Sequence, residues 1–541
     1  MKIIIAYLVV NVSLMLFTVS AQNTSQYIDV VNGKSVEFNH FWSTCVGAGR
    51  ANEGLRASWL EQLQTVHSEC GFKYCRFHGL LHDDMFVYNM VNGKPFYNFQ
   101  YVDDLFDRML KIDVKPFVEL AFMPTKLSSG EKTIFWWKGN TNPPADYDKW
   151  ADLVTACVTH WIDRYGLEEV RSWYFEVWNE PNLNAFWTGT KSEYFKLYNY
   201  SAKAIKTVDK KLRVGGPATS NFVPDTRFDG EKEDKSKHST ATAKNLDELT
   251  WQGVWIKDFL QYCKQENLPV DFVSTHPYPT DWALDPASGK SFRGIRGKDA
   301  TQTDMQWLNK TIKESAYPNA EIHLTEWSSS PSPRDNNHDR LPAAAFIIRT
   351  NLQCIGLTNS LSYWTFTDVF EEGGAGNSIF HGGFGMINYQ GIVKPAFHAY
   401  RMLNQLGDLL LNIEEGLIVT KSSKTGKIIA LAYHYPNEVK TSLEADADVV
   451  EKKGNPKMFE LNLKNLKMNA TFQTELLNKE YGYAYPLWKK MGSPEPPTHQ
   501  QTETLKKAAL SLKIEKIKTT KGIFQWKQLL NPWECVIIKE Q

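Results

Sequence analysis

The sequence alternates short apolar runs with amphipathic helical patterns throughout residues 41–405. The helical stretches place apolar residues at three-and-four spacing, which gives a helix one buried face. This alternation favours a parallel sheet, because each helix returns the chain to the starting edge of the next strand. Eight strands that each precede a helix predict a closed (β/α)8 TIM barrel. We expect strands at residues 41–47, 74–80, 115–122, 173–179, 213–218, 271–276, 321–326 and 360–366, and helices at 147–164, 192–208, 254–265 and 343–354.

A different pattern begins after residue 405. Short runs alternate apolar and polar residues with a period of two and without helical spacing, which is typical of an antiparallel β-sandwich. A chain of 541 residues exceeds the usual size of one hydrophobic core, so a second domain is expected. The sequence therefore predicts an α/β catalytic barrel at 41–405 and a β-sandwich accessory domain at 406–541, which the segment 22–40 joins as a strand. The sandwich strands are expected at residues 417–419, 428–434, 457–462, 509–517 and 533–539, and the lysine-rich stretch 506–521 is expected to be a solvated strand face.

The N-terminus has the features of a secretory signal peptide. Lys2 precedes an apolar run at residues 3–17 that only Asn11 and Ser13 interrupt, and small residues end at Ala21. The alternative, a membrane anchor, is disfavoured because a span needs roughly 20 apolar residues. The sequence predicts a signal peptide at 1–21, cleavage near Ala21, export to the periplasm or the extracellular space, and no stable membrane insertion.

The charge balance and the aromatic content bear on the partner. The chain has 61 Lys+Arg and 61 Asp+Glu, so it lacks the net positive charge that recruits nucleic acid. Aromatic residues make up 13% of the sequence, and their rings can stack on sugars as well as fill a core. These properties disfavour nucleic acid as a partner, permit a neutral carbohydrate, and leave a homo-oligomer open.

The seven cysteines are scattered singly and lack the spacing of metal ligands. An odd, dispersed set does not indicate a disulfide framework, although a bridge between Cys70 and Cys75 remains open. No metal and no other cofactor is expected.

Two glutamates stand where two strands are predicted to end. Glu180 follows the fourth strand and precedes Pro181, and Glu326 ends the seventh strand. The C-terminal ends of barrel strands meet at one mouth, where barrel enzymes place their active sites. Glycoside hydrolysis needs two carboxyl groups on either side of the scissile bond, so the pair predicts a glycosidase.

Two long segments are predicted at the same mouth, residues 225–247 after the fifth strand and 281–301 after the sixth. Loops that follow barrel strands border the active site. For the first segment, a disordered surface insertion is an equal alternative.

From about residue 45 to residue 403 the sequence resembles the β-xylosidases of glycoside hydrolase family 39, relatives of the α-L-iduronidases. The motif Trp178-Asn179-Glu180-Pro181-Asn182 contains a triplet that many barrel glycosidases share, whereas the whole series of motifs is specific. The matching segments are 45–50, 76–81, 116–120, 122–124, 178–182, 215–218, 274–278, 325–327, 363–372 and 381–385.

The resemblance implies that Glu180 is the general acid/base and Glu326 the nucleophile of a retaining double displacement. It also implies that Asn179 bonds the sugar 2-hydroxyl. Arg76 can stabilise the charge of Glu326, and Tyr278 can donate a hydrogen bond to the same carboxylate, so both are expected to support the nucleophile.

Five further residues are assigned to sugar binding with the help of the resemblance. His78 and His276 lie at strand ends where donors to hydroxyl groups are needed, and Trp364 is expected as a stacking floor, with core packing as its alternative. Glu371 and Glu372 are expected to accept hydrogen bonds from the outer hydroxyls. An acid at that place would repel the carboxylate of an iduronide, so it favours a xyloside.

Pro331 departs from the family pattern, because several members have a tyrosine five residues after the nucleophile. An α-L-iduronidase-like or α-L-arabinosidase-like specificity on the same scaffold is therefore the alternative. Two readings of other classes are a non-catalytic carbohydrate-binding protein, which the retained pair of glutamates disfavours, and a metal-dependent hydrolase, which would need clustered histidines.

Overall fold

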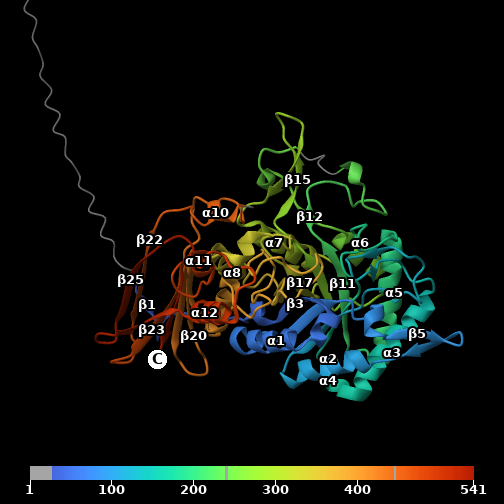
Figure 1. The fold of residues 1–541 in the computed structure, drawn as a ribbon, viewed down its shortest axis with the longest axis horizontal. Helices are drawn as coiled ribbons and strands as arrows, with labels where there is room; N and C mark the ends of the chain where they lie inside the picture. Colours follow the sequence, from blue (N-terminus) through green and yellow to red (C-terminus); the bar gives the residue numbers. More distant parts are fainter. Residues whose placement is uncertain (1–26, 238–241, 444–445) are drawn as a thin grey trace, which may run out of the picture.

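The computed structural model describes residues 27–237, 242–443 and 446–541. The predicted signal peptide at 1–21 lies outside these residues. Figure 1 shows two parts side by side: the segments from blue to yellow form the larger one, and the orange and red C-terminal segments form the smaller one.

The larger part is a closed barrel of eight parallel strands. Around the barrel their order is β3, β4, β7, β10, β11, β14, β17 and β18, so each strand lies beside the strands that precede and follow it in the barrel. This arrangement confirms the predicted α/β fold class. The strands are β3 (Cys45–Arg50), β4 (Tyr74–His78), β7 (Lys115–Glu119), β10 (Tyr174–Glu176), β11 (Arg213–Ser220), β14 (Phe272–His276), β17 (Glu321–Trp327) and β18 (Ser360–Tyr363).

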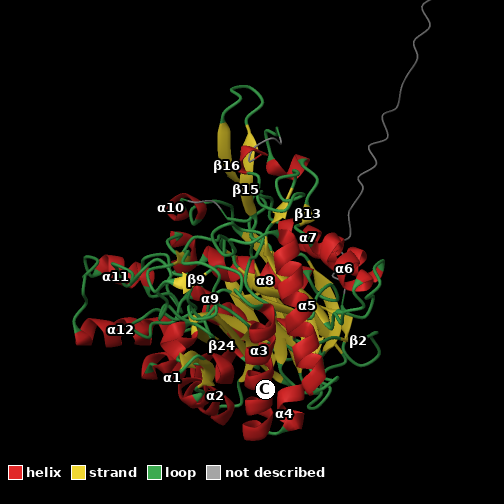
Figure 2. Cartoon of the chain, turned by 90° about the vertical axis from the view of Figure 1, so that its right-hand side faces the viewer, coloured by secondary structure: helices red, strands yellow, loops and turns green. Residues whose placement is uncertain are grey.

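Helices surround the barrel, as Figure 2 shows in red around the yellow strands. Local sequence fixes several of their starts: Asp146 caps the first turn of α3, and Thr190 with Glu193 forms a capping box at α5. The helices are α1 (Ala57–Cys70), α2 (Gln100–Lys111), α3 (Tyr147–Tyr165), α4 (Leu167–Arg171), α5 (Lys191–Val208), α6 (Ile256–Gln265), α7 (Ala300–Lys313), α8 (Pro342–Gln353) and α9 (Pro395–Asn404).

Aromatic side chains close the barrel at the end opposite the candidate site. Phe117 stacks on Tyr174 with ring centroids 4.8 Å apart, and Phe272 meets both rings edge-on. Together with Cys45 they form a buried apolar cluster inside the barrel. This floor leaves polar side chains to occupy the middle and the C-terminal mouth.

The smaller part consists of two sheets that enclose a second core, which includes Val30, Phe459 and Trp526. A seven-stranded sheet has the order β2-β19-β20-β21-β26-β23-β24, and a three-stranded sheet has the order β1-β22-β25. The segment before the barrel supplies one short strand to each sheet. The strands are β1 (Ile28–Asp29), β2 (Val36–Glu37), β19 (Leu409–Glu414), β20 (Leu417–Lys421), β21 (Ile428–Tyr433), β22 (Lys457–Lys464), β23 (Thr471–Leu477), β24 (Lys513–Lys518), β25 (Phe524–Leu530) and β26 (Cys535–Glu540).

Helix α8 lies between the two parts. Its residues from Pro342 to Leu352 are all buried, and Arg349 forms an ion pair of 2.9 Å with Glu415 of the sandwich. The second domain therefore packs against the barrel.

Several predicted boundaries differ from the structure. The strands predicted to end at residues 80, 122 and 366 end at His78, Glu119 and Tyr363. Residues 41–43 form a 3-10 helix and not the start of the first strand, and β10 ends at Glu176 and not at residue 179. The strand predicted at 509–517 starts only at Lys513, because α12 (His499–Leu510) precedes it. The capping box of Thr498 and Gln501 starts this helix, a signal that the alternation of the surrounding strands obscured. The short helices α10 (Ala447–Val450) and α11 (Tyr485–Lys490) were also not predicted.

The loops that follow the barrel strands contain small two-stranded sheets. The segment predicted at 281–301 contains a hairpin of β15 (Thr280–Leu284) and β16 (Ser291–Ile295). The other pairs are β5 (Tyr88–Val91) with β6 (Lys94–Tyr97), β8 (Thr133–Ile134) with β9 (Gly139–Asn140), and β12 (Phe222–Val223) with β13 (Gln252–Gly253).

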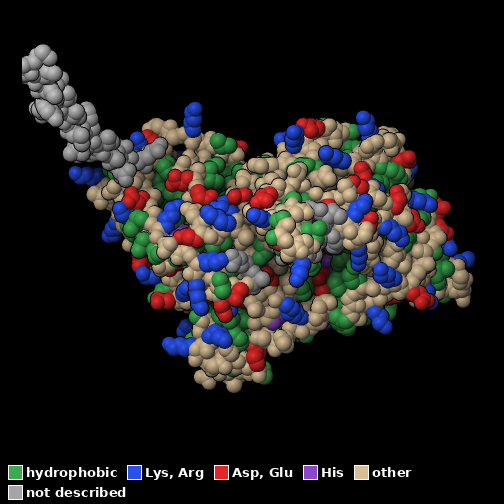
Figure 3. Space-filling view, turned by 90° about the horizontal axis from the view of Figure 1, so that it is seen from above, with side chains coloured by type: hydrophobic (Ala, Val, Ile, Leu, Met, Phe, Trp, Pro, Cys, Tyr) green, Lys and Arg blue, Asp and Glu red, His purple; other side chains and the backbone are tan. Residues whose placement is uncertain are grey.

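All seven cysteines are buried free thiols, so Cys70 and Cys75 do not form a bridge. The lysines of β24, at the edge of the seven-stranded sheet, are exposed. On the face in Figure 3, basic and acidic side chains are intermingled. Within the described part of the chain, no helix has both the length and the apolar character that crossing a bilayer requires.

Candidate active site

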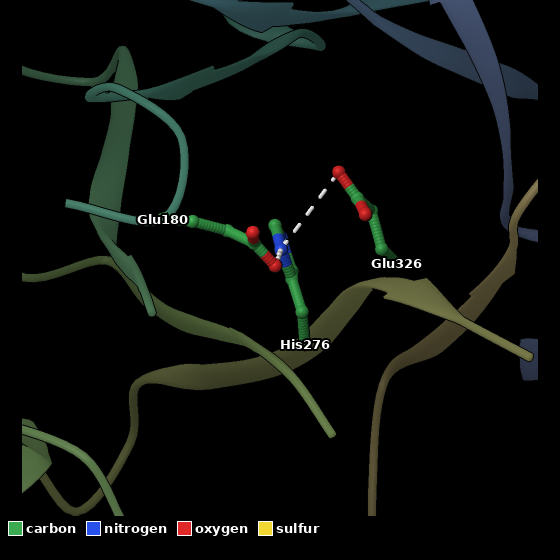
Figure 4. A group of neighbouring side chains, drawn as sticks. All are labelled: Glu180, His276 and Glu326. Carbon is green, nitrogen blue, oxygen red and sulfur yellow. Dashed lines mark hydrogen bonds and ion pairs between the residues drawn. The ribbon is translucent and has the colours of Figure 1, made fainter. Parts of the chain in front are cut away.

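Glu180 and Glu326 converge at the mouth of the barrel. Glu326 lies on β17, and Glu180 lies in the loop that follows β10. Figure 4 shows both side chains pointing toward His276, which ends β14. One carboxylate oxygen of each glutamate and one ring nitrogen of His276 all lie within 4.8 Å of one another.

The loop that carries Glu180 has an unusual backbone. Trp178 has a φ of 74° and Glu180 a φ of 45°, in the left-handed region that side chains with a Cβ rarely adopt. Glu180 N donates to Ala218 O at 2.8 Å, and the indole N–H of Trp178 donates to Phe186 O at 2.9 Å. These bonds hold a strained loop that positions the carboxyl group of Glu180 and the neighbouring amide of Asn179.

A cavity of about 340 Å³ opens beside the two acids. Its volume is at the lower end for small-molecule sites, which suits one or two sugar units. It is lined by His78, Asn179, Glu180, Leu183, Phe186, Ser220, Asn221, Val223, Arg227, Phe228, Glu233, Tyr278, Asp281, Trp282, Glu326, Pro331, Trp364, Glu372 and Phe384.

Arg76 is fully buried beneath this cavity and binds four side chains. Its Nη1 donates to Glu326 at 2.6 Å and its Nε to Glu176 at 2.7 Å. Its Nη2 lies 2.8 Å from Glu119 and donates to the amide oxygen of Asn179, also at 2.8 Å. We call these five residues the Arg76 cluster. Because the guanidinium occupies the oxygen of Asn179, the amide nitrogen is left as the donor on the cavity side.

Tyr278 supplies a second donor to Glu326. Its hydroxyl donates to the other carboxylate oxygen at 3.1 Å. Burial and the negative charge of Glu326 hold the pKa of Tyr278 well above its usual value, so the phenol keeps its proton. Each oxygen of Glu326 therefore accepts a hydrogen bond, which stabilises the carboxylate as an anion.

Glu180 has different surroundings. Burial raises the pKa of Glu180 to about 7, although Ser220, His78 and Arg76 act in the opposite direction. Its Oε1 lies 3.0 Å from Nδ1 of His276. At neutral pH a large fraction of Glu180 is thus a neutral acid beside an anionic Glu326.

His78 connects the Arg76 cluster to the outer wall of the cavity. Its Nδ1 lies 2.7 Å from Glu119, and its Nε2 lies 3.4 Å from Glu372 and 3.5 Å from Glu326. Burial opposes the charge of this imidazole, but Glu119 above all raises the pKa of His78 to about 10. His78 is therefore a cation whose Nε2–H faces the cavity.

The structure places most of the predicted residues at the cavity. His78, Asn179, Tyr278, Trp364 and Glu372 line it together with the two acids, and Arg76 lies behind Glu326 as predicted.

Two residues that were assigned to sugar binding lie elsewhere. Glu371 forms ion pairs with Arg56 at 2.6 Å and with Arg50 at 3.5 Å, so these arginines turn its carboxylate away from the cavity. His276 is fully buried, and its two ring nitrogens contact Glu180 and Thr325, so neither nitrogen is available to a sugar.

The sequence interpretation missed Glu176, Thr325 and the pair of Arg227 with Asp281. Glu176 and Thr325 point into the barrel, and the one available signal was a glutamate inside an otherwise apolar strand, which requires a buried partner. Arg227 and Asp281 belong to the two long loop segments, whose mutual contact no local pattern indicates.

The described residues contain one set of three potential metal ligands, Glu180, His276 and Glu326. A cation there would lie next to the Arg76 guanidinium, which already binds Glu326 at 2.6 Å. The donors of this set are engaged in the hydrogen bonds described above.

The sequence matches the family model "Glycosyl hydrolases family 39" over residues 28–229 and 250–522. The chain belongs to glycosyl hydrolase family 39. The β-xylosidase of Geobacillus stearothermophilus is 38% identical over 516 residues, which cover 94% of each chain. The β-xylosidase of Caldicellulosiruptor saccharolyticus is 38% identical over 484 residues, 89% of this chain and 90% of that protein.

A solved structure of similar fold is that of a monomeric β-xylosidase from Caulobacter crescentus CB15. It has a TM-score of 0.81 at 31% identity and covers 95% of this chain and 98% of its own. The family and the cavity together make this protein a glycosidase with a carbohydrate substrate, and not a binding protein without a reaction.

We expect Arg76→Met to remove the counterion of three buried carboxylates. Breaking such a cluster should lower the free energy of unfolding by about 3–5 kcal/mol, and the loss of charge support for Glu326 should lower kcat at least about 100-fold. Chemical denaturation and kinetics measure the two effects. Arg296→Met is the matched control, because Arg296 is a buried arginine paired with Asp304 outside the catalytic cavity. It should cost stability without a comparable loss of kcat; equal losses of kcat would contradict the role of Arg76.

Proposed function

We propose that this protein is a β-xylosidase that releases terminal β-linked xylose with net retention of configuration. The observation that carries the proposal is the pairing of two carboxyl groups with oxygens within 4.8 Å in one buried cavity. Retaining glycosidases hold their carboxyl groups about 5–5.5 Å apart, whereas inverting enzymes need about 6.5–9.5 Å to admit a water. The names of the relatives described above support xylose as the sugar.

In the first step, Glu326 attacks the anomeric carbon, and Glu180 gives its proton to the departing oxygen. The anionic state that Arg76 and Tyr278 support is the state that a nucleophile needs, and the pKa of about 7 suits Glu180 as the acid. In the second step, Glu180 accepts a proton from water, which displaces Glu326 from the sugar. Two inversions give net retention.

The charges of the cavity support a neutral sugar. Its lining includes the acids Glu372, Asp281 and Glu233 in addition to the catalytic pair. Arg227 also lines the cavity, but Asp281 and Asp225 bind its guanidinium. A uronate would therefore meet carboxylates and no arginine free to pair with it among the described lining residues. The cationic His78 also lines the cavity, but it already lies 2.7 Å from Glu119 and 3.4 Å from Glu372. These charges disfavour the iduronidase-like alternative. An arabinosidase-like specificity is not disfavoured by charge.

The azide test separates the two catalytic roles. Glu326→Ala should abolish turnover, and azide should restore an inverted glycosyl azide because it occupies the place of the nucleophile. Glu180→Ala should slow natural xylosides by about 10²- to 10⁴-fold but should spare the glycosylation step with dinitrophenyl xyloside. Azide should then give the β-xylosyl azide with retained configuration.

Burst kinetics and NMR of the azide products measure these outcomes. A retained azide from Glu326→Ala, or an equal loss across all leaving groups for Glu180→Ala, would overturn the assignment. Glu119 would then be the next acid to examine.

Glu372→Gln tests whether Glu372 accepts hydrogen bonds from the outer hydroxyls of the sugar. The loss of a charged acceptor should lower kcat/KM for aryl β-xyloside by about 10- to 100-fold without creating activity on an iduronide. Glu371→Gln is the control, because the neighbouring carboxylate is bound by Arg56 and Arg50. A panel of aryl β-xyloside, α-L-arabinoside and iduronide measures both variants. Preferred hydrolysis of either of the other two glycosides by the unaltered enzyme would reject the xylosidase proposal.

We also propose that the protein is exported and cleaved after Ala21. The support is the N-terminal sequence itself, with Lys2, a short apolar run and small residues before the cut. N-terminal sequencing of the protein recovered outside the cytoplasm should start at Gln22, and Ala21→Lys should leave the precursor uncleaved. A mature chain that retains Met1 would contradict the proposal.

A further inference from the structure

A chain of buried hydrogen bonds leads from the Arg76 cluster to Glu180. Glu176 Oε1 accepts from the hydroxyl of Thr325 at 2.7 Å, and the same hydroxyl oxygen lies 2.9 Å from Nε2 of His276. Nδ1 of His276 then lies 3.0 Å from Glu180 Oε1. Glu176, Thr325 and His276 are each fully buried, so water does not compete for these bonds.

The direction of each bond follows from the number of available protons. Glu176 is an anion: burial opposes its charge, but Arg76, His276 and the hydroxyls of Ser274 and Thr325 together lower its pKa. An anionic carboxylate only accepts hydrogen bonds, so Thr325 must donate its single proton to it. The oxygen of Thr325 can then only accept from His276, which places a proton on Nε2.

The state of Nδ1 follows in turn. Burial lowers the pKa of His276 to about 4, and Arg76 and His78 act in the same direction against the attraction of Glu326 and Glu176. With Nε2 protonated and the ring neutral, Nδ1 carries a lone pair. The contact of this lone pair with Glu180 is a hydrogen bond only if Glu180 holds the proton.

We propose that Glu176, Thr325 and His276 form a relay of positioning residues that keeps Glu180 protonated in the free enzyme. This inference rests on the proposed acid/base role of Glu180. The relay makes Nδ1 of His276 a hydrogen-bond acceptor, so it stabilises the protonated form of Glu180. The ionised form of Glu180 instead faces the lone pair of Nδ1, which repels it. After the proton has passed to the leaving group, this repulsion favours rotation of the carboxylate away from His276 and raises its basicity toward water. His276 gains and loses no proton in the cycle.

The relay predicts that Glu176→Gln reverses the direction of its hydrogen bonds and the tautomer of His276. Arg76 Nε donates to Oε2 of Glu176 at 2.7 Å, so the amide oxygen should take that place and the NH2 group should face Thr325. Thr325 would then donate to Nε2, and the proton of His276 would move to Nδ1, where it stabilises ionised Glu180. Activity requires protonated Glu180 and is lost as pH rises through its pKa. The apparent pKa of the alkaline limb in the pH profile of kcat/KM should therefore fall from about 7 by about one unit or more.

Removal of the Glu176 charge alone also lowers the pKa of Glu180, so the test needs two backgrounds. Thr325→Val cuts the relay while it preserves the shape of the side chain, and Thr325→Ser keeps the hydroxyl. The shift caused by Glu176→Gln should be full in the Thr325→Ser background and reduced at least by half in the Thr325→Val background. An equal shift in both backgrounds would mean that only charge acts, and it would overturn the relay.

The tautomer can be measured without any catalytic variant. In the ¹⁵N-histidine NMR spectrum of the unaltered enzyme, assigned by the loss of a signal in His276→Gln, His276 should show a protonated Nε2 and an unprotonated Nδ1. The reverse tautomer would reject the inference. This spectrum needs no substrate, so it remains decisive if aryl β-xylosides are not hydrolysed, a result that would reject the proposed function alone. The pH profile would then be recorded with the aryl glycoside that is cleaved.

Discussion

The active site depends on one buried guanidinium. Arg76 has no exposed surface, and its planar fork meets Glu119, Glu176, Glu326 and Asn179 at distances of 2.6–2.8 Å. A buried charge of this kind is tolerated only when good geometry and further hydrogen bonds offset the loss of water. The rigid fork of arginine satisfies this condition, and the point charge of a lysine would not. These bonds connect β4, which carries Arg76, to β7, β10 and β17, which carry the three glutamates.

The same interaction gives the two glutamates of the proposed catalytic pair different surroundings. Glu326 is bound directly by the guanidinium and by Tyr278, whereas Glu180 meets a buried neutral imidazole. Two identical side chains therefore meet different surroundings: hydrogen-bond donors face both oxygens of Glu326, whereas burial raises the pKa of Glu180 to about 7. Such a difference is the condition for one carboxyl group to act as nucleophile and the other as acid. The strained loop with Glu180 at a φ of 45° is the structural cost of bringing the acid to this place.

The sequence was sufficient for the features that follow from local pattern. The alternation of strands and helices predicted the barrel, and the ends of the fourth and seventh strands indicated Glu180 and Glu326. The sequence pattern did not predict the orientation of side chains whose partners are distant in the sequence. Glu371 and Glu372 are adjacent and chemically equal. Glu371 is turned away from the cavity by Arg50 at the end of β3 and by Arg56 in the segment that follows this strand. His276 was assigned to the sugar for the same reason, because its competing partners lie on β17 and in the loop after β10.

Two kinds of structure line the cavity, the barrel strands and the long loops. Several lining residues of the cavity, among them His78 and Glu326, lie on barrel strands, and the Arg76 cluster connects these strands. Another part of the lining comes from the two long loop segments, and Arg227 of the first binds Asp281 of the second as well as its neighbour Asp225. Burial raises the pKa of Asp281 against the effect of Arg227, so this pair is a costly contact that specifies how the two segments meet. This part of the cavity wall therefore depends on the two insertions, whereas the Arg76 cluster beneath it depends on the barrel strands.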